Sequence, residues 1–139
     1  MVKVSKSEQD TLDTAKELLK ALSQKENVVC LFGDLGSGKT VFVKGIAKAL
    51  GIDDYTVKSP TYTFIREYTH KKGKLIHVDL YRLEQIDDLL LDQIEEFSLV
   101  PSNLIVIEWA DRMGETLPEN HKDVCFEHVD EHTRKITVF

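Results

Sequence analysis

The sequence has little cysteine and no long apolar run. Its 139 residues include two cysteines, Cys30 and Cys125, both in apolar, strand-like stretches with no metal-ligand company. This placement favours buried thiols in a reducing compartment over a disulfide. A membrane span needs about 18 consecutive apolar residues, and the sequence has no such run. The N-terminus has no apolar segment behind a basic start, so we expect a cytoplasmic protein that does not use a membrane.

The sequence also lacks an excess of positive charge. Its net charge is −6 and its pI about 5.3, whereas affinity for nucleic acid comes mainly from cations that neutralise phosphates. Strong independent binding to nucleic acid is therefore not expected, although a local basic patch or action through a partner stays open. The one candidate basic patch can equally be a solvated hairpin tip, and it consists of Arg66, His70, Lys71, Lys72 and Lys74.

The length and the periodicity predict one α/β domain over residues 1–139. Apolar residues at spacings of three and four predict helices over about 7–23, 39–50 and 84–97, the first with capping-box spacing between Ser5 and Glu8. Short apolar runs predict buried strands at 27–32 and 104–109, and turn residues predict hairpins over 62–81 and in the tail. We expect three layers, with a mainly parallel central sheet and antiparallel hairpin additions at its edges.

The stretch "GDLGSGKT", from Gly33 to Thr40, matches the pattern G-x-x-x-x-G-K-[ST] between a predicted strand and a predicted helix. Glycines let the backbone wrap closely around phosphate oxygens, and the helix directs its positive end at the same anion. Lys39 can then reach the β- and γ-phosphates, and the Thr40 hydroxyl can hold Mg²⁺. The sequence therefore predicts a nucleotide site, because a mere glycine-rich turn would need these features to coincide by chance.

Two acidic residues end apolar strands and can complete this site. Asp79 ends "KLIHVD" and Glu108 ends "LIVIE", where a carboxylate can position Mg²⁺ or water. His77 shares a strand face with Asp79, and we interpret it as a core histidine with satisfied hydrogen bonds. Arg82 follows directly and would favour ionisation of Asp79.

A further segment, "KSPTYTF", lies between the glycine loop and Asp79. Pro60 restrains Ser59 to an extended conformation, so the hydroxyl of Thr61 can sense a γ-phosphate, as switch segments do. Trp109 can stack on a base, although an isolated tryptophan usually lies in a core.

Together these motifs resemble the bacterial TsaE family, small P-loop ATPases of the pathway that makes threonylcarbamoyladenosine in tRNA. The matching stretches are "LFGDLGSGKTVFVKGIAKALGI", "VKSPTYTFIREY", "IHVDLYRLE" and "VIEWADRM", in the family's order and spacing. The resemblance implies a P-loop NTPase fold and a weak ATPase that works with a TsaD–TsaB assembly and contacts tRNA at most indirectly. It implies that ATP or ADP and Mg²⁺ bind at Gly33, Asp34, Leu35, Gly36, Ser37, Gly38, Lys39 and Thr40. It also implies Thr61 as the switch residue, Arg82 near the nucleotide, Asp79 and Glu108 as the essential acids, and Thr11 and Trp109 near the adenosine.

Two other functions stay open from the residues alone. A small-molecule kinase would need an acceptor pocket and usually an arginine-bearing lid, for which no insertion is long enough. A nucleotide sensor would bind ATP without needing fast hydrolysis, and no arginine finger is evident beyond Arg82. We therefore expect slow turnover by the isolated protein, because an arginine supplied by a partner can raise the rate on the order of a thousandfold or more.

Overall fold

The computed structural model describes residues 1–23, 25–52, 65–81, 83 and 85–139. Its strands form one sheet in the order β1-β7-β6-β2-β5-β4-β3. The four middle strands β6, β2, β5 and β4 run parallel, while β1, β7 and β3 are antiparallel to their neighbours. The predicted parallel sheet with antiparallel additions is confirmed. The strands are β1 (Val2–Ser5), β2 (Val28–Phe32), β3 (Ile65–His70), β4 (Gly73–Asp79), β5 (Leu104–Glu108), β6 (His121–His128) and β7 (Arg134–Val138).

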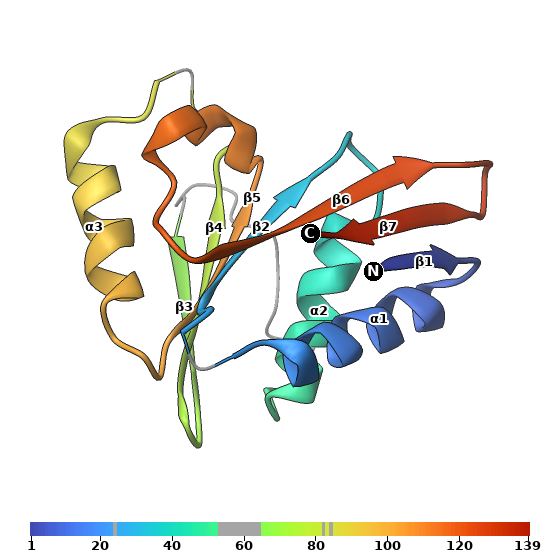
Figure 1. Cartoon of the computed structure of the whole chain (residues 1–139), viewed down its shortest axis with the longest axis horizontal. Coiled ribbons are helices and arrows are strands. Elements are labelled where there is room, and N and C mark those ends of the chain that lie inside the picture. Colours follow the sequence, from blue (N-terminus) through green and yellow to red (C-terminus); the bar gives the residue numbers. More distant parts are fainter. Residues whose placement is uncertain (24, 53–64, 82, 84) are drawn as a thin grey trace.

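Helices cover both faces of this sheet, which gives three layers (Figure 1). Helices α1 (Glu8–Ala21) and α2 (Lys39–Ala49) pack on one face, and α3 (Asp88–Ser98) and the 3-10 segment η2 (Ala110–Thr116) on the other. Each face carries its own apolar layer, and β2 is buried over most of its length between them. None of the described helices has the length and apolar composition needed to cross a membrane.

Helix α1 begins two residues later than the predicted capping box implies. Ser7, not Ser5, is the N-cap, and its Oγ accepts a hydrogen bond from the Asp10 backbone N–H at 3.1 Å. The Ser5 hydroxyl instead donates to the Ser7 carbonyl at 2.9 Å and lies 2.7 Å from the hydroxyl of Thr11. The predicted Ser5–Glu8 box is therefore wrong, because Ser5 ends strand β1 and its side chain is buried under the helix.

Helices α1 and α2 pack closely at Gly45. A Cβ at this position would lie 2.8 Å from the Ala15 Cβ and 3.0 Å from the Leu12 backbone, closer than carbon atoms can approach without a shift. The backbones therefore meet where α2 has no side chain. This contact fixes α1 against α2, whose first residues belong to the glycine loop.

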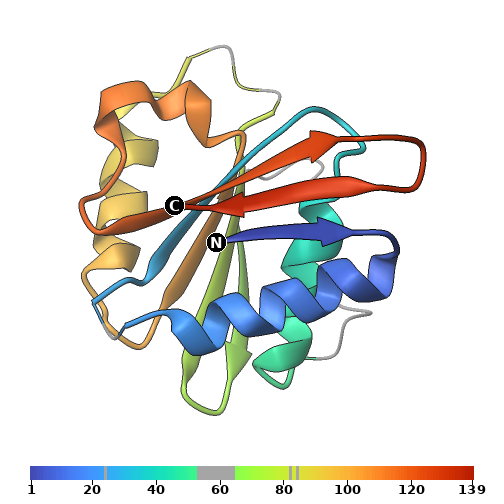
Figure 2. The same cartoon turned by 45° about the vertical axis from the view of Figure 1, so that its right-hand side comes forward.

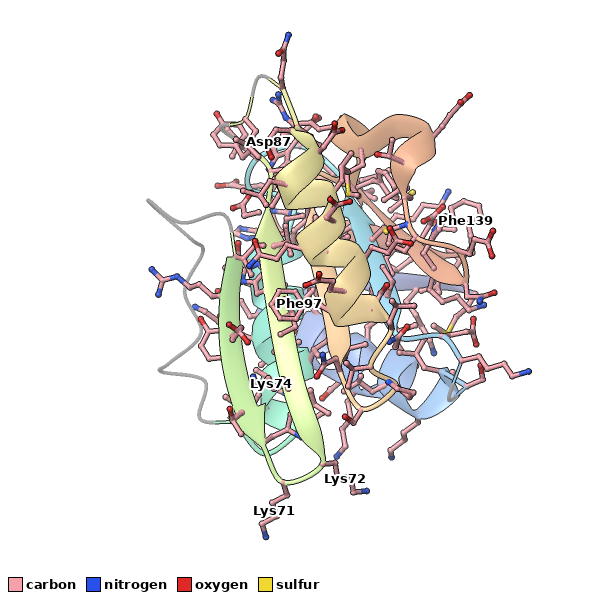
Figure 3. All side chains as sticks on the ribbon, turned by 90° about the vertical axis from the view of Figure 1, so that its left-hand side faces the viewer. Lys71, Lys72, Lys74, Asp87, Phe97 and Phe139 are labelled. Atoms are coloured by element: carbon pink, nitrogen blue, oxygen red, sulfur yellow. The ribbon has the colours of Figure 1, made fainter. Side chains whose placement is uncertain are left out.

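The two predicted hairpins are present. Strands β3 and β4 pair through a turn at Lys71 and Lys72, whose side chains extend from the hairpin tip in Figure 3. Lys74 is paired with Glu67 at 3.2 Å, so part of the basic cluster is already neutralised. Strands β6 and β7 form the second hairpin.

Strand β1, which pairs with β7, was not predicted from the sequence. Its N-terminal ammonium donates to the Val138 carbonyl at 3.1 Å, so the described chain ends lie side by side at one sheet edge (Figure 2). Helix α3 also differs from the prediction, since it begins at Asp88 behind an Asp87 N-cap rather than near residue 84.

Candidate functional site

The glycine loop joins the carboxyl end of β2 to the first turn of α2. Gly33 has a φ of +152°, and a Cβ there would lie 2.7 Å from the Ser37 Oγ and 2.9 Å from the Phe126 carbonyl oxygen. Any side chain at Gly33 would therefore collide with the loop or with β6. Gly38 is the N-cap of α2 in a left-handed conformation, so the helix N–H groups open toward the loop.

Lys39 is the first residue of α2 and is only 5% exposed. Its Nζ donates to the Gly33 carbonyl and lies 3.5 Å from the centroid of the Trp109 ring, a cation–π contact. Burial lowers the pKa of the Lys39 ammonium, and the nearby carboxylates of Glu108 and Asp79 oppose this shift. The ammonium is thus held inside the loop, next to the two predicted acids.

The two acids stand side by side at the carboxyl ends of neighbouring parallel strands. Asp79, the last residue of β4, is opposite Glu108, the last residue of β5. The Thr40 Oγ1 donates to the Glu108 Oε1 at 3.4 Å, which is a long hydrogen bond. The structure therefore brings Lys39, Thr40, Asp79 and Glu108 together, as the sequence predicted.

His77 belongs to this site through Glu108. It is fully buried, as a core histidine would be, but its Nε2 lies 2.5 Å from the Glu108 Oε2. Its Nδ1 has no hydrogen-bond partner among the described residues. The imidazole thus orients one carboxylate oxygen, while the other faces Thr40. The two-residue spacing only places His77 on the same strand face as Asp79, and the contact with Glu108 depends on the register of β4 against β5.

Asp79 is in a different environment from Glu108. Burial raises the pKa of its carboxyl, a backbone hydrogen bond from Tyr81 lowers it, and the charge of Glu108 raises it. The Tyr81 N–H donates to the Asp79 Oδ1 at 3.0 Å. Asp79 therefore holds a proton more readily than an ordinary aspartate.

The side chains of this site fit a magnesium ion. Mg²⁺ prefers oxygen ligands, and it is usually bound by one or two carboxylates together with substrate phosphates. The hydroxyl of Thr40 and the carboxylates of Glu108 and Asp79 supply such oxygens at one end of the sheet. In the loop itself, the Ser37 Oγ is buried without a partner in the described part of the chain, so it can donate to an anion in the loop.

A cavity of about 260 Å³ lies on the other side of the loop. Its lining includes Thr11, Gly36, Gly38 and Arg134, and the Arg134 Nη2 donates to the Gly36 carbonyl at 3.2 Å. Thr11 is thus placed beside the loop. A larger cavity, of about 750 Å³, lies between α3 and η2 and has no loop residue in its lining.

Trp109 lies away from the smaller cavity and contacts the Lys39 side of the loop. It is in a left-handed conformation with a φ of 60°, and its ring centroid lies 5.0 Å from that of Tyr81. The side chain therefore covers the Lys39 ammonium. Two other predicted site residues, Thr61 and Arg82, lie outside the described residues.

The comparisons with known proteins agree with these motifs. A sequence model of the family described as "Threonylcarbamoyl adenosine biosynthesis protein TsaE" matches residues 5–136. The chain is 38% identical to the tRNA threonylcarbamoyladenosine biosynthesis protein TsaE of Aquifex aeolicus, over 98% of this chain and 93% of that protein. It is 36% identical to the protein of the same name from Treponema pallidum, over 97% of each chain.

A solved structure shares the fold. The crystal structure of Bacillus subtilis YdiB aligns with a TM-score of 0.75 and 30% sequence identity, covering 99% of this chain and 83% of that chain. The shared sheet, with the glycine loop between β2 and α2, is the P-loop NTPase fold that the sequence predicted. The family match spans nearly the whole chain, and we conclude that the chain belongs to the TsaE family of threonylcarbamoyladenosine biosynthesis proteins.

Proposed function

We propose that the protein binds and hydrolyses ATP with Mg²⁺, and thereby serves the formation of threonylcarbamoyladenosine in tRNA together with a TsaD–TsaB complex. The observation that carries this proposal is the convergence of Lys39, Thr40, Asp79 and Glu108 at the mouth of the glycine loop. A loop that only connected β2 to α2 would have no need to bury a lysine beside two carboxylates.

In this proposal the loop binds the phosphate chain. The amides of residues 33–38 and the buried Ser37 hydroxyl donate to phosphate oxygens, and the α2 N-terminus adds its positive end. Lys39 exchanges the Gly33 carbonyl and the Trp109 ring for phosphate oxygens, which are stronger partners for an ammonium. The base and sugar then occupy the cavity beside Thr11 and Arg134.

The two carboxylates have different tasks in this proposal. Glu108, oriented by His77 and next to Thr40, holds the metal together with the Thr40 hydroxyl. Mg²⁺ would supply positive charge that neutralises the phosphates. Asp79, whose pKa is raised by burial, accepts the proton of the attacking water. The described chain offers Arg112 and Arg134 near the site, but their guanidinium groups donate to the Leu83 and Gly36 carbonyls, so fast turnover needs the partner complex.

Calorimetry with ATP and Mg²⁺ tests the binding step. Lys39→Ala should weaken ATP binding at least about tenfold, because charge-assisted hydrogen bonds contribute about 1.5–3 kcal/mol each. Lys48→Ala, on the exposed side of the same helix, is the matched control and should bind as the parent chain does. Folded parent protein that takes up no ATP, or equal binding by both variants, contradicts the proposal.

Glu108→Gln and Asp79→Asn test hydrolysis. Both should bind ATP, lose phosphate release, and fail to support tRNA modification in a reaction reconstituted with TsaD–TsaB. If both variants bind ATP and still support modification, ATP binding alone is the signal and the protein is a sensor. Transfer of phosphate to an added acceptor, instead of release of free phosphate, would identify a kinase.

A further inference from the structure

Three potential metal ligands from two central strands meet on the sheet face away from α1 and α2. Cys30 of β2 is opposite Asp123 of β6, and His121 is two residues earlier on β6. The Cys30 Sγ, a His121 ring nitrogen and an Asp123 carboxylate oxygen all lie within 4.8 Å of one another. Along the sequence Cys30 has no neighbouring metal ligands, because only the β2–β6 register brings these residues together.

The strand pattern explains why all three side chains share one face. Side chains alternate between the two faces along a strand. Val124 and Phe126 of β6 lie in the apolar layer under α1 and α2, so His121 and Asp123 face the other way. Cys30 belongs to the apolar layer of that opposite face. Both strands lie inside the sheet and are hydrogen-bonded, so their side chains are held on a rigid support.

We propose that Cys30, His121 and Asp123 form a binding site for a divalent transition-metal ion of the Zn²⁺ type, with one coordination position left to water. Zn²⁺ takes thiolate, imidazole and carboxylate ligands together, at about 2.3 Å from sulfur and about 2.0–2.2 Å from nitrogen and oxygen. In a tetrahedral site this places the ligand atoms roughly 3.3–3.8 Å apart. Small side-chain rotations bring the three atoms from their present spacing to that range.

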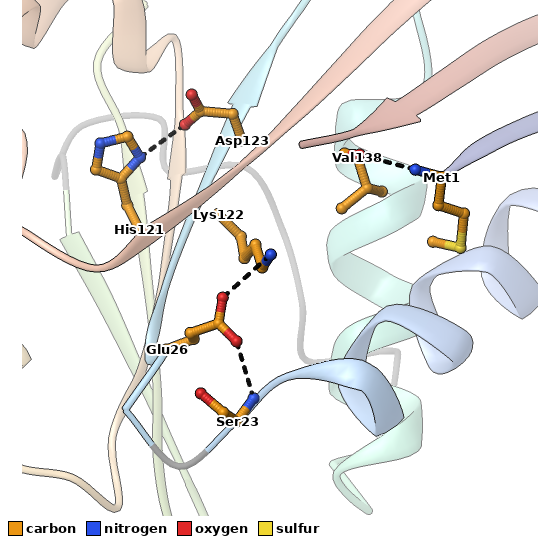
Figure 4. A network of polar contacts seen from close by, with 7 residues as sticks. All are labelled: Met1, Ser23, Glu26, His121, Lys122, Asp123 and Val138. Carbon is orange, nitrogen blue, oxygen red and sulfur yellow. Dashed lines mark hydrogen bonds and ion pairs between the residues drawn. The ribbon is translucent and has the colours of Figure 1, made fainter.

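The surroundings leave these ligands available to a metal. The His121 Nδ1 and the Asp123 Oδ1 lie 2.8 Å apart (Figure 4). Both side chains are about one-third exposed, at 29% and 33%. The neighbouring cation Lys122 projects from the opposite face of β6 and is paired with Glu26 at 3.2 Å, so it does not neutralise Asp123. An ion can therefore enter from solvent between His121 and Asp123, with Cys30 as the buried third ligand.

The buried Cys30 thiol is a poor nucleophile, and it must lose its proton to bind a metal. Burial, with a smaller effect of Asp123, raises the pKa of its thiol to about 12. The free thiol is therefore neutral and inert at physiological pH. When a divalent ion binds, the thiol proton passes to solvent and the thiolate charge is compensated by the metal. The site uses no residue of the glycine loop, so it is independent of the proposed ATPase.

Cobalt(II) titration of the untagged full chain tests the site, in the presence of excess Mg²⁺ and without nucleotide. Cobalt is a spectroscopic substitute for zinc, and only a thiolate ligand gives the near-ultraviolet sulfur-to-cobalt charge-transfer band. We expect one equivalent of cobalt to produce this band, and zinc to abolish it by displacement. Excess Mg²⁺ occupies the carboxylates near Thr40, which have no sulfur ligand and cannot produce the band.

Variants assign the ligands. Asp123→Asn and His121→Gln change partly exposed side chains and should keep the fold by circular dichroism, while weakening cobalt binding at least about tenfold. Cys30→Ser should remove the band. Cys125→Ser is the matched control, because Cys125 lies on the same face of β6 as Asp123 but is not in the cluster. This variant should keep the band.

Three results would overturn the proposal. The first is a parent chain that gives no charge-transfer band with cobalt. The second is a band that vanishes in Cys125→Ser but persists in Cys30→Ser. The third is cobalt binding by both Asp123→Asn and His121→Gln that is as tight as that of the parent. In each case His121 and Asp123 form an ordinary hydrogen-bonded pair beside an unrelated buried thiol.

Discussion

Replacing His77 with leucine tests how much the protein depends on a partner for its buried acid. The Glu108 carboxylate is 4% exposed and contacts the fully buried His77 ring at 2.5 Å. Leaving a buried polar group without its hydrogen-bond partner costs about 1–3 kcal/mol, and more for a charged group such as a carboxylate. Thr40 and Lys39 remain near Glu108 and compensate part of this loss, so we expect a loss of about 3 kcal/mol. For a chain of this size, the corresponding fall in Tm is about 10–15 °C.

Urea denaturation followed by circular dichroism measures this loss, with a double-mutant cycle to isolate the pair. His77→Leu in a Glu108→Gln background should cost at least about 1.5 kcal/mol less than His77→Leu alone, because a neutral amide is easier to bury than a carboxylate. The control is His121→Leu in the presence of a chelator. Its partner Asp123 is one-third exposed, so the loss should be about 1 kcal/mol or less.

A loss below about 1 kcal/mol in His77→Leu, or one no larger than that in His121→Leu, would refute this role of His77. So would a cycle that shows no coupling between His77 and Glu108. Either result would mean that Glu108 does not need His77 in the folded state, and that the contact has no part in orienting the carboxylate.

Three further predictions follow from contacts described above. Gly45→Ala should cost about 1–3 kcal/mol in urea, because its Cβ meets the Ala15 Cβ at 2.8 Å; Ala15→Gly should recover part of this loss, and no change in either variant would show that the helices are not tightly packed. The pKa of Asp79 is raised on folding, so ionising this carboxyl costs more free energy in the folded chain than in the unfolded chain. Above the folded pKa, and therefore at neutral pH, ionised Asp79 destabilises the fold. Asp79→Asn should therefore be more stable than the parent at pH 7, and this difference should vanish as the pH falls below the ordinary aspartate pKa of about 4; equal stability at pH 7 would contradict the assignment. The fluorescence of Trp109, the only tryptophan, should change when ATP draws Lys39 off its ring, and Lys39→Met should remove that response; a response that survives in the variant would place its origin elsewhere.

The parts of the fold that the sequence predicted depend on local signals. The glycine loop, the start of α2 at Lys39 and the apolar strands β2 and β5 are each set by a few consecutive residues. The end of α2 before Gly51 is equally local, since Gly51 has a φ of +83°. Asp79 and Glu108 were predictable because each ends an apolar strand, and parallel strands bring such ends to one sheet edge.

The features that escaped prediction depend on distant partners. Strand β1 has only four residues and becomes a strand by pairing with β7 at the other end of the chain. Ser5 has the spacing of a helix cap but is buried, so tertiary contacts assign capping to Ser7. The role of His77 depends on the register of β4 against β5, and a single sequence does not specify that register.

The pairing of β1 with β7 has a consequence for the order of events during biosynthesis. The N-terminal amine and its partner carbonyl are 137 residues apart in sequence. During synthesis, residues Val2–Ser5 therefore leave the ribosome long before β7 has been made. These residues stay unpaired and solvated while the central strands assemble. Closing this edge is then among the last steps of maturation, and a nascent chain halted before residue 134 would leave Val2–Ser5 open to protease.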